Sequence, residues 1–168
     1  MANSSFSGPV RSQNGFAAYS PSSTTSNVSI PLATQGTGVV VPTVGPIVNF
    51  TTVTTSTTAG AVTYTAAQLK GGLILRDPNG AGRSDVTPTA ALLVAALPSA
   101  VVGTSFTFTI RNDADAAETI TVTAGSGATL SGTMTIAQNN MKSFLVVLTN
   151  VTSGAEAYTV YSLGTVVF

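Results

Sequence analysis

The chain has 168 residues, of which 43% are hydrophobic and only 7% are Asp, Glu, Lys or Arg, and its formal net charge is zero. An ordinary soluble domain carries about 25% charged residues, so the low charge indicates that much of the surface contacts other protein. The chain has no histidine and no cysteine, which excludes disulfides and catalysis by a Ser–His or Cys–His pair. Without these residues we do not expect an enzyme. Nucleic-acid affinity comes largely from clustered Lys and Arg, and with a net charge of zero we do not expect a nucleic-acid-binding protein either.

Residues 1–47 predict an extended N-terminal arm, and residues 48–168 predict a β-rich core domain. The arm is rich in Ser, Thr, Gly and Val, and from Ser12 to Leu69 there is no charged residue. Its prolines forbid a long helix; they stand at positions 9, 21, 31, 42 and 46. The N-terminus lacks a basic start followed by an apolar stretch, so we do not expect a signal peptide. The longest apolar run, Ala90–Leu97, is far shorter than the ~20 residues that cross a bilayer, so we expect no membrane partner.

The first part of the core domain predicts short strands around one helical turn. The β-branched segment Val48–Thr55 predicts a strand, and Ala61–Thr65 predicts another. Ala66–Lys70 predicts one helical turn, which the two following glycines would close. Gly72–Arg76 then predicts a short strand, and Asp77–Gly80 predicts a turn because it contains Pro and Asn-Gly.

The segment Thr87–Pro98 carries the strongest helix signal in the chain. Thr87 is suited to be the N-cap, and Pro88 is suited to the first helical position. Pro98 would end the helix. The segment is apolar nearly all round, so we expect a buried helix.

The last seventy or so residues predict a succession of strands. Thr104–Arg111 and Thr119–Thr123 alternate between apolar and polar residues, and Lys142–Thr149 has the continuous apolar centre that is typical of a strand buried on both faces. Shorter strands are expected at Leu130, Thr133–Ile136, Ala157–Tyr161 and Thr165–Phe168. The sequence therefore predicts an all-β fold, an antiparallel β-sandwich or small barrel with one short buried helix and the extended arm.

Two segments of the core domain contain several acidic residues. Asp113, Asp115 and Glu118 are close in sequence, but a catalytic carboxylate pair usually faces a substrate across a cleft, and these three lie in one connection. We therefore predict a solvated hairpin tip.

The segment Asp77–Asp85 has oxygen ligands and glycines that suggest a calcium loop. It lacks the closing Glu and the spacing of an EF-hand. We predict instead a turn braced by Arg76, Arg83 and its own aspartates, and we expect no catalytic residue, no cofactor and no metal.

Several segments resemble small virion-associated proteins of tailed bacteriophages and cyanophages. They are Phe6–Phe16, Gly71–Gly80, Thr87–Leu93 and Phe108–Val122. The resemblance implies a capsid decoration (cement) protein, an accessory β-domain that is often trimeric and sits on the capsid exterior. Its partners would be the major capsid protein and copies of itself.

In this interpretation the arm carries the interface. Phe6, Val10 and Phe16 would fill pockets on the partner, and Pro9 would lower the entropy lost on docking. Arg11 would meet a carboxylate or carbonyls of the partner. The alternatives are a tail, neck or head-fibre component, and a host-receptor or glycan-binding β module. A glycan-binding module would require a pocket with clustered Tyr and carboxylates.

Overall fold

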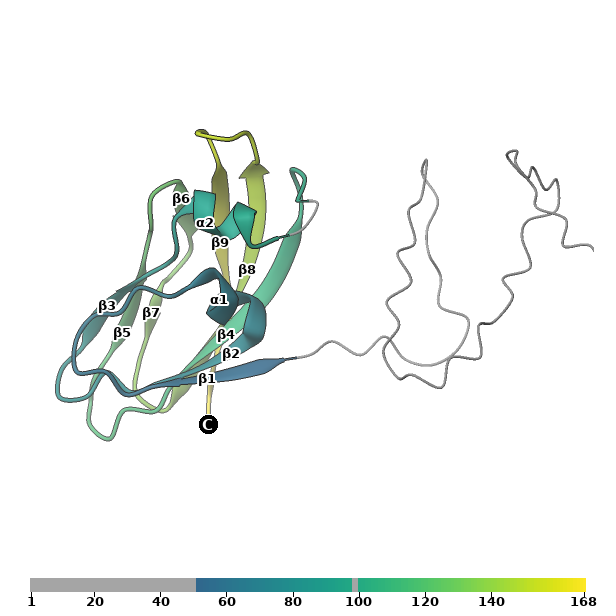
Figure 1. Cartoon of the computed structure of the whole chain (residues 1–168). Coiled ribbons are helices and arrows are strands. Elements are labelled where there is room, and N and C mark those ends of the chain that lie inside the picture. Colours follow the sequence, from purple (N-terminus) through teal and green to yellow (C-terminus); the bar gives the residue numbers. More distant parts are fainter. Residues whose placement is uncertain (1–50, 98–99) are drawn as a thin grey trace, which may run out of the picture. The chain divides into compact units, whose positions relative to one another are not determined.

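The computed structural model describes residues 51–97 and 100–168, which form two β-sheets and two short helices (Figure 1). The predicted arm, residues 1–47, lies outside the described residues. The elements follow the chain in the order β1 (Thr52–Ser56), α1 (Ala66–Gly71), β2 (Gly72–Arg76), β3 (Arg83–Val86), α2 (Ala90–Ala95), β4 (Ser105–Asn112), β5 (Ile120–Thr123), β6 (Ala128–Ser131), β7 (Thr135–Ile136), β8 (Asn140–Asn150) and β9 (Ala157–Val167). The mainly β character that the sequence predicts is therefore confirmed.

The two sheets are mixed, and the expectation of a purely antiparallel fold is wrong. The larger sheet has the strand order β1-β2-β4-β8-β9-β6, and the smaller sheet has the order β3-β5-β7 (Figure 1). The pairs β1/β2, β2/β4, β3/β5 and β6/β9 are parallel, whereas β4/β8, β8/β9 and β5/β7 are antiparallel. Parallel neighbours need a crossover connection. Helix α1 lies in the crossover from β1 to β2, while β3 and α2 lie in the one from β2 to β4.

Both sheets contribute to one hydrophobic core. Phe108 of β4 and Phe144 of β8 are buried, with ring centroids 5.0 Å apart. Ile120 and Ile136 of the smaller sheet belong to the same cluster. The alternation predicted for Thr104–Arg111 is thus confirmed, because residues two apart along a strand share a face.

Strand β8 is buried on one face, not on both as its apolar run predicts. Its even-numbered residues from Lys142 to Leu148 are buried, whereas Ser143, Leu145 and Val147 are only half-buried. A run of apolar residues indicates contact on both faces, but the second face of β8 is uncovered in the described part of the chain.

Helix α1 begins at Ala66 as the sequence predicts and ends at Gly71, one residue later than predicted. The Gln68 N–H donates to Thr65 Oγ1 at 3.2 Å, and the Thr65 N–H donates to Gln68 Oε1 at 2.7 Å, which together form a capping box. Gly72 ends the helix in the left-handed conformation, with φ at 92°. Leu69 is fully buried and anchors the helix in the core.

Helix α2 begins two residues later than predicted and is only partly buried. Its N-cap is Thr89 instead of Thr87, so Pro88 precedes the cap. Thr87 is engaged by the chain around the end of β5, because its N–H donates to the Thr123 carbonyl and its hydroxyl accepts from the Gly125 N–H, both at 2.9 Å. Leu92 is 63% exposed. The expectation of a single, buried helix is therefore wrong.

Candidate functional site

One candidate surface is the uncovered face of the larger sheet, which we call the outer face. The strand register aligns its side chains in rows, because directly paired residues share a face. One row consists of Val53, Leu73, Thr109, Ser143 and Gly164, and the next consists of Thr55, Leu75, Arg111, Met141 and Val166. These rows are apolar or hydroxylated apart from Arg111, and the Arg111 guanidinium is paired with Asp113 at 2.5 Å.

The outer face continues into an apolar C-terminal strip, residues 161–168. Five large apolar side chains in this strip are between 41% and 74% exposed: Tyr161, Leu163, Val166, Val167 and Phe168. Strand β6 pairs with β9 only as far as Tyr161, so among the described residues the edge of β9 beyond this point has no neighbouring strand. Leu163 is the extra residue of a β-bulge against β8. A free, apolar strand edge is suited to pair with another chain.

A cavity of about 710 Å³ opens beside the first half of β4. Strand β2 pairs with β4 only from Thr109 onward, which leaves room next to Ser105–Phe108. The lining residues are Thr51, Lys70, Gly71, Gly72, Ser105, Phe106, Thr107, Phe108, Thr109 and Leu145. The lining contains no tyrosine and no carboxylate, which are the groups expected of a glycan pocket.

A buried ion pair joins β2 to β3. Arg76 and Asp85 are both fully buried, and Arg76 Nε donates to Asp85 Oδ2 at 2.9 Å. The Tyr64 hydroxyl donates to Asp85 Oδ2 at 2.8 Å, and the Val62 N–H donates to Asp85 Oδ1 at 3.0 Å. Burial raises the pKa of Tyr64 far above its ordinary value, and the neighbouring Asp85 carboxylate raises it further.

The other guanidinium N–H groups of Arg76 bind carbonyls of the connection between β1 and α1 and of the turn that follows β2. They donate to the carbonyls of Thr58 at 2.9 Å, Gly60 at 2.5 Å and Asp77 at 2.5 Å. Arg83 Nε donates to the Pro78 carbonyl at 3.3 Å. The predicted brace of this turn is confirmed, and its hydrogen bonds are those of a structural ion pair.

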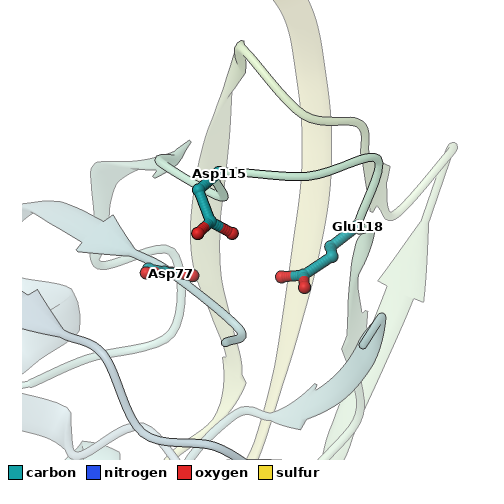
Figure 2. Close-up of side chains that lie close together, drawn as sticks. All are labelled: Asp77, Asp115 and Glu118. Carbon is teal, nitrogen blue, oxygen red and sulfur yellow. The ribbon is translucent and has the colours of Figure 1, made fainter. Parts of the chain in front are cut away.

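Three carboxylates from two loops converge into an acidic trio, Asp77, Asp115 and Glu118 (Figure 2). One carboxylate oxygen of each lies within 4.8 Å of the other two. Asp77 follows β2, whereas Asp115 and Glu118 belong to the connection between β4 and β5. Asn112 stabilises this connection, since its Nδ2 donates to the carbonyls of Glu118 at 2.9 Å and Ile136 at 3.0 Å.

The trio corrects the prediction of a fully solvated hairpin tip. Asp115 is exposed as expected, but Glu118 is only 6% exposed. Asp113 turns away and binds Arg111 through two hydrogen bonds, of 2.5 and 2.8 Å. The sequence places Asp77 only in the Asp77–Asp85 loop, because nothing in the local sequence shows that this loop meets the one that carries Asp115 and Glu118.

The predicted arm residues Phe6, Pro9, Val10, Arg11 and Phe16 lie outside the described residues. Within residues 51–97 and 100–168, no helix is long and apolar enough to span a membrane. Comparison with protein-family models, curated proteins and solved structures finds no match to this chain.

Proposed function

We propose that the chain is a virion structural protein of the capsid decoration (cement) type, which bridges major capsid protein subunits on the capsid exterior as a homotrimer. The observation that carries this proposal is the outer face, an almost uncharged sheet face that continues into the exposed C-terminal strip. Monomeric proteins rarely expose large contiguous apolar patches, and those that exist mark interaction sites. The low charge of the whole chain points the same way.

Self-association would use the C-terminal strip. Fully burying a large apolar side chain contributes about 1.5–3 kcal/mol. The strip's five side chains are about half exposed on average, so each could add roughly 1 kcal/mol when a second copy covers it. Strand pairing along the free edge of β9 would add backbone hydrogen bonds. The rest of the outer face would then remain available to the capsid.

We propose further that the two sheets form a β-sandwich rather than a closed barrel. The core that they share supports this arrangement. The strand orders also leave each sheet with edge strands, β1 and β6 in one and β3 and β7 in the other. A barrel would close such edges.

Cryo-electron microscopy of the parent particle tests the virion role. We expect density for the domain on the outside of the head, in contact with several capsid subunits. Density confined to the tail, the neck or a head fibre would overturn the cement proposal, and absence from the particle would overturn the virion role.

Light scattering of the purified full chain tests self-association, with a trimer as the expected mass. A variant that lacks residues 1–20 tests the arm. We expect this deletion to lower the occupancy of the protein on particles. Unchanged occupancy would refute the role of Phe6, Pro9, Val10, Arg11 and Phe16.

A further inference from the structure

We infer that Asp77, Asp115 and Glu118 form a binding site for one calcium ion. Figure 2 shows the three side chains around one space between two loops, with the Glu118 carboxylate directed toward it. The site does not depend on the proposed virion role.

The concentration of negative charge at this place is unusual for such a chain. The chain has six acidic residues in total, and three of them form the trio. The others have partners: Asp85 and Asp113 are in salt bridges, and a Glu156 oxygen accepts from the Gly154 N–H at 3.0 Å. No salt bridge of the described residues reaches the trio. Like charges so close together repel unless a cation compensates them.

Glu118 supplies a second and independent observation. Its Oε1 accepts from the Gly80 N–H at 2.6 Å, which fixes the orientation of the carboxylate. Its Oε2 is buried and has no hydrogen-bond partner, although buried polar atoms are nearly always satisfied. A bound cation would supply the partner that this buried carboxylate oxygen lacks.

The chemistry of the donors favours calcium. All three offer only oxygen, and hard cations prefer oxygen ligands. Calcium accepts six to eight oxygens in flexible geometry, whereas magnesium requires a near-ideal octahedron. Asp77 is already oriented, since its Oδ1 accepts from the Asn79 N–H at 2.9 Å. Asp115 is exposed, so water can reach the ion and complete its coordination.

The position of the site gives calcium a structural effect. Asp77 lies on the loop from β2 to β3, and Asp115 and Glu118 lie on the loop from β4 to β5. Each of these loops leads from the larger sheet to the smaller one. An ion bound by both loops would link them to each other and so stabilise the two sheets against separation.

Isothermal titration calorimetry of the full chain, stripped of metal with a chelator, tests the site with CaCl₂. We expect one ion per chain and a rise in Tm of several degrees at about 10 mM calcium, which exceeds the weakest dissociation constants common for extracellular calcium modules. The same concentration of MgCl₂ should give a smaller rise.

Two variants locate the site. Asp115→Asn changes an exposed side chain and should fold, and it should weaken calcium binding at least ~10-fold. In chelator it should be at least as stable as the wild type, because one repelling charge is gone. Glu156→Gln is the matched control, and it should bind calcium like the wild type. The proposal is overturned if the wild type shows neither binding heat nor a Tm shift, if Asp115→Asn binds unchanged, or if mild acid raises the Tm while calcium does not.

Discussion

Replacing Asp85 with alanine tests how much of the domain's stability depends on the buried ion pair. The substitution leaves the Arg76 guanidinium buried without its carboxylate. It also removes the acceptor of the Tyr64 hydroxyl and of the Val62 N–H. Both members of the pair are fully buried, so at most a water in the vacated space could replace the lost partner, and it would not restore the negative charge.

The expected loss follows from this burial. Removing one partner of a buried ion pair costs about 3–5 kcal/mol, because a charge stays behind uncompensated. The two orphaned donors place Asp85→Ala at the upper end of this range. A typical domain is stable by only about 5–15 kcal/mol, so the variant should be marginally folded or unfolded.

Urea denaturation followed by circular dichroism measures this loss, and the chain offers a matched control. Asp113 pairs with Arg111 at the surface, where the two side chains are 26% and 41% exposed. Asp113→Ala should therefore cost about 0–1 kcal/mol.

A second variant separates charge from packing. Replacing Arg76 and Asp85 together with Met and Leu leaves no buried charge, so it should regain much of the stability lost in Asp85→Ala. The reasoning is refuted if Asp85→Ala and Asp113→Ala lose the same free energy of unfolding, or if Asp85→Ala loses less than about 1 kcal/mol.

Three further predictions follow from other parts of the domain. Leu163→Glu places a charge in the C-terminal strip and should lower the oligomer mass in light scattering, whereas Leu92→Glu, at an exposed site on α2, should leave it unchanged. The raised pKa of Tyr64 favours the neutral phenol in the folded state. The free energy of unfolding should therefore hold below pH ~10 and fall above it, because tyrosine ionises in the unfolded chain. Tyr64→Phe should lose less free energy of unfolding at alkaline pH, as measured by urea titrations. Gly125→Ala would place a Cβ 2.2 Å from a backbone oxygen and should lose about 1–3 kcal/mol. This loss should exceed that of Gly82→Ala, whose Cβ would come no closer than 2.9 Å to Thr119 Oγ1, and equal losses would contradict this.

Features that depend on neighbours in the sequence could be predicted. The limits of α1 follow from Thr65, Gln68 and the glycine after the helix, all within a few residues. The alternation of β4 likewise places Phe108 in the core, because it depends only on the period of a strand.

Features that depend on distant parts of the chain could not be predicted. Thr87 looks like a helix cap, but its hydroxyl accepts a hydrogen bond from the Gly125 N–H, just after β5, and α2 begins at Ala90. The parallel pairing of β1 with β2 depends on the path of the connection, which strand periodicity does not report. Glu118 looks solvated until the loop that carries Asp77 is placed beside it. The candidate cation site therefore arises only from the tertiary fold.

Among the described residues the edge of β9 beyond Tyr161 is unpaired, and this limits how the protein can be produced and altered. Natural edge strands are commonly guarded by lysine, proline or a short length, yet residues 161–168 contain no lysine and no proline. An unguarded apolar edge is a template for aggregation until something covers it. Val166→Lys would place a gatekeeper on this edge and improve the yield of isolated protein, at the expense of the proposed contact between copies. In the proposed assembly, the same few side chains would therefore favour both the contact between copies and aggregation of the isolated protein.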